Sequence, residues 1–244
     1  MSSFNRRREV ILALGAAPLL AATAGRAQAP SVPEAGTDFN VVPNPQPTDS
    51  PSKVEVLDFF WYGCPHCYAF LPELESWRKK LPADVDFRHV AVDFGSPARE
   101  VHTKIFYALQ VLNRVDDMHV KVFDAFHLKH QPLNDRDAVA DFMAANGIDR
   151  AKWLDMYNSF AVTTKTRAAY QTQINYNVEG TPTLAVDGKY LTAPSQVRTQ
   201  TRAGAIYVLD YLVERARRER GSKSDSAMII AMTRRGSSRL RCEK

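Results

Sequence analysis

The sequence predicts an α/β fold that carries an all-helical insertion. An apolar run of strand length, residues 54–62, passes directly into a segment with apolar residues at helical spacing, residues 65–77. A long helical block then separates this unit from a second region of strand character around residues 183–191. Strands and helices that alternate on both sides of such a block indicate an α/β core with an insertion.

The first half of the core has clear element boundaries. Residues 54–62 are rich in β-branched and aromatic side chains and are followed by Gly63, which favours a strand. Pro65 stands at the first position of the next helix, where its missing N–H costs little. Residues 85–92 alternate enough to predict a half-buried strand.

The insertion is expected from Ser96 to about Ile174, because apolar residues recur there at spacings of three and four. Turn signals at Asn134-Asp135 and Asn146-Gly147 divide this region. The spacing predicts four helices, near residues 97–112, 116–128, 135–145 and 150–173.

The second half of the core begins with a strand at residues 183–186. Asp187-Gly188 is typical of a type I′ hairpin turn and leads into a strand at residues 189–191. Ser195 is expected to cap a last amphipathic helix that ends near Arg218.

Composition divides the chain further. We expect a cleaved signal peptide at 1–29, a proline-rich extended leader at 30–52 with an edge strand near 38–42, the core at 53–95 and 175–220, the insertion at 96–174, and a basic, disordered tail at 221–244 that contains Cys242.

The formal net charge is +5. The two ends carry all of this excess, and residues 30–220 carry about −2. The folded body therefore gives no basis for nucleic-acid binding.

The first 29 residues have the pattern of an export signal. Arg6, Arg7 and Arg8 precede an apolar stretch, and Ala27-Gln28-Ala29 fits a small-residue cleavage site. The general secretory (Sec) route is favoured over the twin-arginine route, because the usual Ser or Thr of the twin-arginine motif is absent. Export to a bacterial periplasm would allow disulfides to persist.

Cys64-Pro65-His66-Cys67 lies at the predicted strand-to-helix turn. Two thiols at a helix N-terminus favour redox chemistry. A structural disulfide is the first alternative, although its four-residue loop would constrain the unfolded chain little.

Two further alternatives concern bound groups. A zinc site needs four ligands, but only Cys242 remains as a third cysteine, and His127 and His130 lie at a predicted helix end. Covalent haem attachment needs His directly after the second cysteine, and position 68 is Tyr. Neither reading fits as well as a redox pair.

Residues 59–68 around the two cysteines, the helical insertion, and residues 178–183 with Thr181-Pro182 together resemble the DsbA family of periplasmic thiol:disulfide interchange proteins. The resemblance covers about residues 36–219. It implies a thioredoxin-like fold whose helical domain is inserted between the second and third central strands. It also implies a cis-proline at Pro182, opposite the cysteine pair.

The residues of the motif suggest distinct catalytic roles. Cys64, at the N-terminal end of a helix that Pro65 opens, lies near unpaired N–H groups that favour its thiolate. His66 is expected to place a donor or a positive charge beside the same sulfur. Cys67, one turn further on, is expected to be buried and Cys64 exposed, so that substrate thiolates attack Cys64.

Three further site residues follow from the resemblance. A cis bond at Thr181-Pro182 would leave the backbone of Thr181 free to pair with an extended substrate, a form of strand addition. The family places a buried acid at the position of Asp58, thought to relay the proton of the inner cysteine. We therefore expect Asp58 to serve Cys67.

The resemblance implies a monomeric oxidase that donates its Cys64–Cys67 disulfide to reduced, unfolded exported proteins. A DsbB-type, quinone-linked membrane protein would reoxidise it, and neither a metal nor an organic cofactor is expected. A disulfide isomerase or reductase of the same superfamily is the first alternative. A peptide-binding periplasmic chaperone is the second, and Cys64→Ser separates it from an oxidase.

Overall fold

The computed structural model describes residues 31–50, 52–131 and 133–239, with side chains up to residue 221. The chain divides into the units Met1–Val32 and Pro33–Lys244, and the fold below is that of the second unit. The predicted signal peptide at 1–29 and Cys242 lie outside the described residues.

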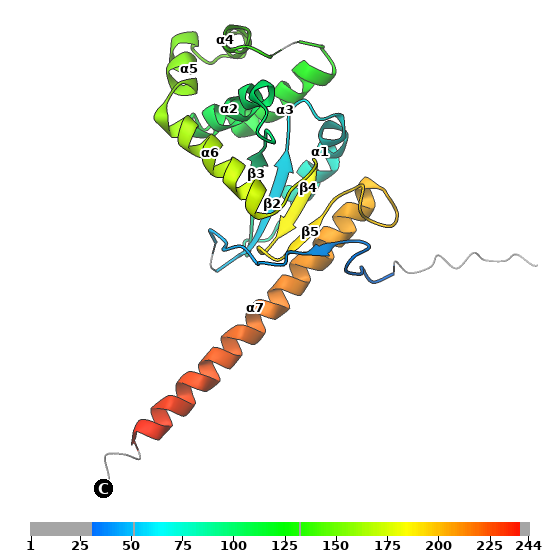
Figure 1. The fold of residues 1–244 in the computed structure, drawn as a ribbon, viewed down its shortest axis with the longest axis vertical. Coiled ribbons are helices and arrows are strands. Elements are labelled where there is room, and N and C mark those ends of the chain that lie inside the picture. Colours follow the sequence, from blue (N-terminus) through cyan, green and yellow to red (C-terminus); the bar gives the residue numbers. More distant parts are fainter. Residues whose placement is uncertain (1–30, 51, 132, 240–244) are drawn as a thin grey trace, which may run out of the picture. The chain divides into compact units, whose positions relative to one another are not determined.

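Five strands form one mixed sheet in the order β1-β5-β4-β2-β3 (Figure 1). Their bounds are β1 Asn40–Val41, β2 Val54–Phe60, β3 Val85–Ala91, β4 Thr183–Val186 and β5 Tyr190–Thr192. Central β2 pairs in parallel with β3 and antiparallel with β4. Every residue of β2 is buried, as expected for a strand with covered faces and neighbours on both sides.

Two helices of the core, α1 (Pro65–Arg78) and α7 (Arg202–Arg239), contact each other, and α7 contacts β2, β4 and β5. Between β3 and β4 the chain forms five further helices: α2 Pro97–Val111, α3 Val115–His127, α4 Arg136–Ala145, α5 Arg150–Tyr157 and α6 Phe160–Asn175. This order confirms an α/β core with a helical insertion between the second and third central strands.

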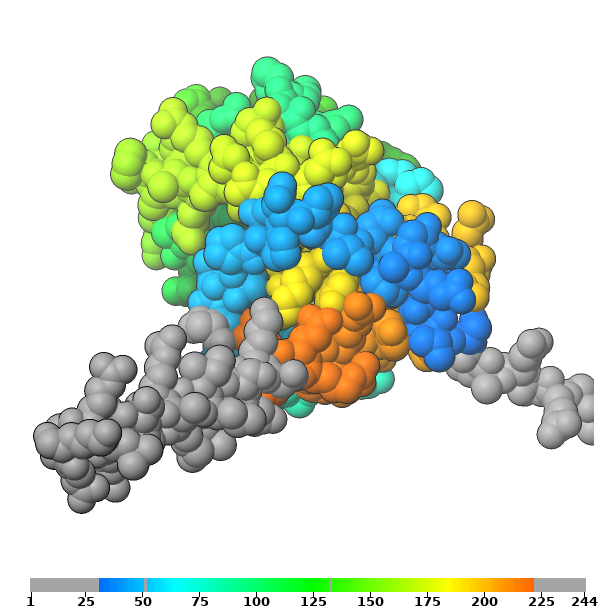
Figure 2. All heavy atoms as spheres, turned by 60° about the horizontal axis from the view of Figure 1, so that its bottom comes forward, coloured from blue at the N-terminus to red at the C-terminus, as the bar shows by residue number. Residues whose placement is uncertain are grey.

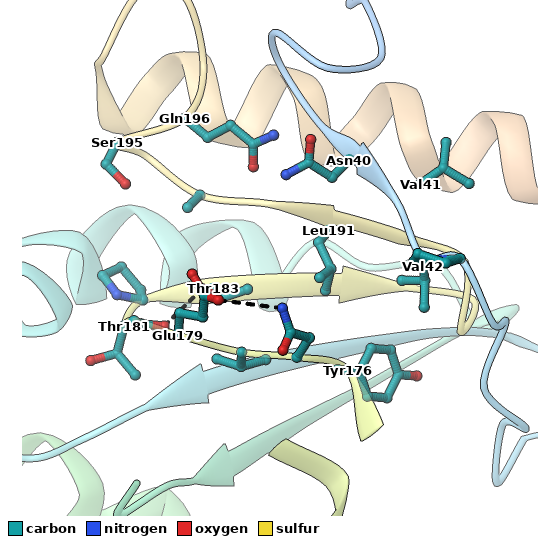
Figure 3. A pocket seen from close by; sticks show the side chains of 16 residues that line it. Asn40, Val41, Val42, Tyr176, Glu179, Thr181, Thr183, Leu191, Ser195 and Gln196 are labelled. Carbon is teal, nitrogen blue, oxygen red and sulfur yellow. Dashed lines mark hydrogen bonds between the residues drawn. The ribbon is translucent and has the colours of Figure 1, made fainter. Parts of the chain in front are cut away.

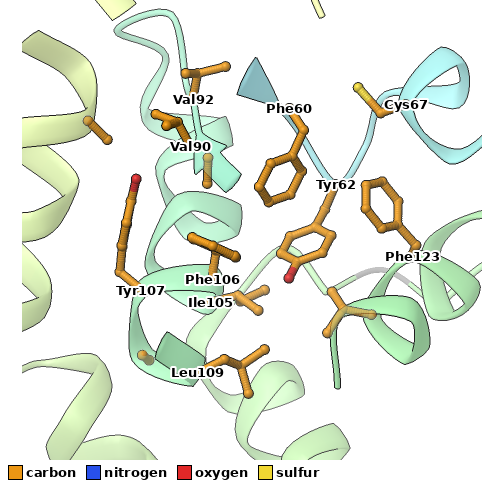
Figure 4. Close-up of a cluster of buried hydrophobic side chains, with 14 of the residues drawn as sticks. Phe60, Tyr62, Cys67, Val90, Val92, Ile105, Phe106, Tyr107, Leu109 and Phe123 are labelled. Atoms are coloured by element: carbon orange, nitrogen blue, oxygen red, sulfur yellow. The ribbon is translucent and has the colours of Figure 1, made fainter. Parts of the chain in front are cut away.

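The sheet and the insertion share one hydrophobic core at the end of β2. Phe60 and Tyr62 point from this end toward Phe106 of α2 and Phe123 of α3 (Figure 4). The ring centroids of Phe60 and Phe106 are 5.2 Å apart. Cys67 lies at the border of this cluster, so the packing that joins the two parts also fixes the surroundings of the cysteine pair.

The leader is held against the sheet. Its strand β1 pairs with β5, and Figure 2 shows the leader (blue) beside the yellow part of the chain and α7 (orange). The N–H of Val42 donates to the carbonyl oxygen of Lys189 over 2.7 Å. Asp187 and Gly188 have φ values of 54° and 69°, which agrees with the predicted type I′ hairpin. A Cβ at Gly188 would lie 2.0 Å from the oxygen of Gln46, so only glycine fits there.

Several helix bounds differ from the prediction. The segment 150–173 forms two helices, because Ser159 accepts a hydrogen bond from the N–H of Val162 and starts a new one. The last helix begins at Arg202 rather than at Ser195, and Thr201 Oγ1 accepts from the N–H of Gly204 at its start. It continues to Arg239, through most of the segment expected to be disordered. No proline follows residue 194 to stop it.

Candidate active site

Cys64 is the N-cap residue of α1. Its backbone is extended, and its Sγ accepts a hydrogen bond from the N–H of Cys67 over 3.4 Å. Pro65 occupies the first helical turn, as predicted. Both cysteines are free thiols in this structure. The sulfur of Cys64 therefore lies where a helix presents its unpaired N–H groups, which stabilise a negative charge.

The surroundings of Cys64 favour its thiolate. A hydrogen bond from the Cys67 side chain is the largest contribution, and burial opposes it. The Thr181 side chain and the N–H groups of Cys67 and His66 add to the stabilisation. Together they lower the pKa of Cys64 to about 5. At neutral pH this sulfur is therefore a thiolate.

Cys67 is in the opposite situation. Burial raises the pKa of its thiol well above the usual value, and the hydrogen bond with Cys64 and the charges of Cys64 and Asp58 add to this. The sequence predicted that only Cys67 would be buried, but both are, with 6% of Cys64 and 4% of Cys67 exposed. The two sulfurs differ in their electrostatic surroundings far more than in their exposure.

His66 places a backbone donor beside the sulfur of Cys64, and the predicted role of its side chain stays a prediction. Its side chain is exposed. Its backbone N–H is among the hydrogen bonds that lower the pKa of Cys64. His66 also lines a groove beside the cysteine pair.

The Thr181-Pro182 peptide bond is cis, in agreement with the family resemblance. The loop brings Thr181 against the first cysteine: Cys64 Sγ is 3.3 Å from the carbonyl oxygen of Thr181, to which it donates only when the thiol is protonated. A groove of about 620 Å³ lies between this loop and α1. It is lined by His66 and Ala69 on one side and by Thr181, Pro182 and the segment before α7 on the other.

Asp58 lies beneath the pair, inside β2. It is 3% exposed, and its Oδ2 is 2.8 Å from His89 Nδ1. Its other carboxylate oxygen, Oδ1, is buried without a hydrogen-bond partner in the described part of the chain. Because the negative charge of Asp58 contributes to the raised pKa of Cys67, the two groups are electrostatically coupled.

Sequence reasoning missed the partners of Asp58. Asp58 and His89 are paired in the parallel register of β2 and β3. His89 Nε2 is also 3.4 Å from Glu75 Oε1 of α1. Burial would lower the pKa of His89, but its hydrogen bonds to Asp58 and Glu75 outweigh burial and raise it. The sequence signal for this contact was a histidine within an apolar strand, but the register of β2 and β3 was needed to place His89 opposite Asp58.

Glu75 completes this buried group. Burial would raise the pKa of its carboxyl, but hydrogen bonds from His89 and Arg78 outweigh burial and hold it at about 2. His89 thus stands between two acids, Asp58 and Glu75, and its raised pKa favours the protonated imidazole there. A positive charge at this position would offset the cost of burying the acid beside Cys67.

The described residues contain neither a candidate membrane span nor a candidate metal site. No helix among them is long and apolar enough to span a membrane. No group of three or more of their His, Cys, Asp or Glu side chains is arranged to hold a metal ion. His127, weighed as a zinc ligand, has its Nε2 2.8 Å from the carbonyl oxygen of Tyr62 and stacks on Tyr68.

Comparisons with known proteins agree with this geometry. Residues 55–206 match a family described as the DSBA-like thioredoxin domain. The chain is 41% identical over 207 residues to the thiol:disulfide interchange protein DsbA of Burkholderia cepacia, covering 84% of this chain and 93% of that protein. The Pseudomonas aeruginosa protein of the same name is 38% identical over 183 residues, which cover 75% of this chain and 85% of that protein. A crystal structure of Pseudomonas aeruginosa DsbA matches with a TM-score of 0.71 at 36% identity, and the match covers 75% of this chain and 94% of that one. These matches confirm the predicted thioredoxin-like fold.

Proposed function

Because the chain belongs to the DsbA family and is therefore a protein-disulfide oxidoreductase, we propose that it works as an oxidase on newly exported proteins in the periplasm. The observation that carries the proposal is the contrast between the two sulfurs: the pKa of Cys64 is lowered to about 5, and that of Cys67 is raised. A pair whose reduced form holds a stabilised thiolate gives up its disulfide readily.

In the first step, a client thiolate attacks Sγ of Cys64. The Cys64–Cys67 bond breaks, a mixed disulfide forms with Cys64, and Cys67 leaves with the electron pair and takes up a proton. In the second step, another client thiolate attacks the client sulfur of the mixed disulfide, and Cys64 leaves as a thiolate. The client loses two electrons and gains a disulfide, and the protein gains both electrons. The low pKa of Cys64 makes it a good leaving group in this second step.

Asp58 is proposed to assist the proton uptake of Cys67. Its partnerless Oδ1 and its coupling to the Cys67 thiol support this role. His89 would hold the carboxylate in place through its hydrogen bond to Oδ2. Asp58 does not touch the client in this scheme and acts through Cys67.

The position of Thr181 beside the sulfur of Cys64 supports a role in client binding. The backbone of Thr181 would pair with an extended client segment, while the groove beside His66 would accept its side chains. A DsbB-type membrane protein is proposed to restore the disulfide, and export is proposed to follow the Sec route. The protein is proposed to act as a monomer without a metal or organic cofactor, since the disulfide itself carries the electrons.

The function can be tested with a reduced, unfolded client that contains two cysteines. The oxidised protein should convert it to the disulfide form stoichiometrically, and Cys64→Ser should abolish this. When the Cys67→Ser variant is prepared as a mixed disulfide between Cys64 and a client thiol, the client should stay bound to Cys64. Cys242→Ser is the matched control, because it removes the third thiol and should leave the rate unchanged.

Two results would overturn the proposal. If Cys64→Ser retained full activity in preventing client aggregation while the wild type oxidised nothing, the protein would be a chaperone. If the wild type acted only on clients with mispaired disulfides, it would be an isomerase.

A further inference from the structure

A second hollow lies on the other side of the Thr181-Pro182 loop. Its volume is about 610 Å³, similar to that of the groove beside His66. The loop before Pro182 and the start of β4 form one wall, and β1 with the segment that follows β5 forms the other (Figure 3). No step of the proposed mechanism uses it.

The hollow and the groove are neighbours on the surface. Thr181, Pro182 and Ser195 line both of them. An extended chain that pairs with the backbone of Thr181 therefore reaches the groove in one direction and the hollow in the other. Since an extended peptide advances about 3.3 Å per residue, the two cavities would receive different residues of one client segment.

The lining of the hollow is mostly uncharged. Asn40 and Gln196 direct side-chain amides toward each other across its upper edge, where they can bond to a peptide backbone (Figure 3). Leu191 and Val42 provide apolar surface. These groups fit a polypeptide segment and do not distinguish between side-chain charges.

Glu179 gives the lining of the hollow its charge. It is the only formally charged side chain among the described residues that line the hollow. It is exposed, and its Oε1 accepts a long hydrogen bond of 3.4 Å from Asn177 Nδ2. Within the described part of the chain no Lys or Arg forms an ion pair with it. In the groove, by contrast, Arg202 is already paired with Glu73 over 2.8 Å.

We propose that the hollow is a second client subsite, which binds the part of an unfolded segment that continues beyond Thr181 and prefers a lysine or arginine there through Glu179. This inference rests on the proposed oxidase function, because it names the class of client that the same site prefers. The occupant is an extended peptide with a positive charge a few residues away from its reactive cysteine.

The test uses short two-cysteine peptides that differ at one position. A Lys, Gln or Glu is placed two to five residues before or after the first cysteine, and the rate constant for oxidation by the oxidised protein is measured. We expect the Lys peptide to react about two- to five-fold faster than the Glu peptide, on one side of the cysteine only, as suits an exposed ion pair. High salt should reduce the ratio.

Substitutions at Glu179 separate this subsite from general charge effects. Glu179→Gln should remove the preference for the Lys peptide, and Glu179→Lys should reverse it. Asp155→Asn on α5 is the matched control, since this exposed carboxylate should not affect the ratio. A ratio that persists in both Glu179 variants, or that is absent in the wild type, contradicts the subsite alone. Failure of the wild type to oxidise any peptide would instead overturn the proposed function.

Discussion

Cys64 and Cys67 are three residues apart, yet they respond to charge in opposite ways. The thiol of Cys67 donates to the sulfur of Cys64, which favours a negative charge on Cys64 and disfavours one on Cys67. Asp58 increases the difference between the two pKa values, because its charge raises the pKa of Cys67. The pair therefore holds one proton and one negative charge when it is reduced, and both have fixed positions.

Replacing Cys67 tests this division. In a Cys242→Ser background, the thiolate absorbance of the reduced protein should titrate with a midpoint of about 5. Cys67→Ala removes the largest stabilising hydrogen bond, which for a charged acceptor is worth about 1.5–3 kcal/mol. The midpoint should then rise by about one to two pH units. An unchanged midpoint would mean that the helix N-terminus alone stabilises the thiolate.

Replacing Asp58 tests the coupling to the inner sulfur. In a Cys64→Ser, Cys242→Ser background, Asp58→Asn removes a negative charge near Cys67 and should lower the pKa of that thiol. Its alkylation above neutral pH should therefore become faster. Glu55→Gln is the matched control, because Glu55 is a buried acid of the same strand that pairs with Arg88. Equal alkylation rates in the two variants would contradict the proposed role of Asp58.

At the scale of elements, one ion pair fixes the segment between β5 and α7. Arg198 donates to Asp38 of the leader from its N–H, at 3.0 Å, and from its guanidinium, at 2.6 Å. The hydrogen bond from the Arg198 side chain, opposed by burial, leads the contributions that lower the pKa of Asp38 to about 2. The same segment contributes Ser195 to both client cavities.

Asp38→Asn should loosen this segment. Since the folded-state pKa lies below the usual 3.8, the stabilisation is present above pH 4 and is lost as the pH falls toward 2. The shift corresponds to about 2 kcal/mol at neutral pH, which urea unfolding can measure. Peptide oxidation should show a raised KM with little change in the Cys64 pKa. Arg136→Gln, which breaks an exposed ion pair on α4, should change neither the free energy of unfolding nor KM.

The sequence allowed most elements to be predicted, because each has a local signal. The apolar run of β2, Pro65 at the start of α1 and the turn at Asp187-Gly188 are such signals. The break between α5 and α6 was missed, because Ser159 lies in a continuous helical pattern and acts only as a local cap. The Asp58–His89 contact depends on strand register, and no local pattern encodes it.

At the scale of the molecule, the thiolate of Cys64 should make stability depend on the redox state. Its pKa is about 5 in the folded reduced protein and about 9 as an ordinary thiol. A lowered folded-state pKa contributes stability above the unfolded value, and this contribution is lost as the pH falls through the folded value. At pH 7 it amounts to about 3 kcal/mol for the reduced form, whereas the oxidised form has no such group.

The difference in unfolding free energy between the two forms isolates this contribution. Every other titrating group that is shared by the reduced and oxidised proteins cancels, and Cys67 stays protonated in the folded and unfolded states below about pH 8. In a Cys242→Ser background, the reduced form should therefore gain about 1.4 kcal/mol per pH unit over the oxidised form between pH 5 and 8, with no gain below pH 5. Urea unfolding of both forms across this range measures it. A pH-independent difference would contradict the low pKa of Cys64. If the expected slope is found, the stabilisation of the reduced form at pH 7 makes the disulfide more oxidising by about 60 mV.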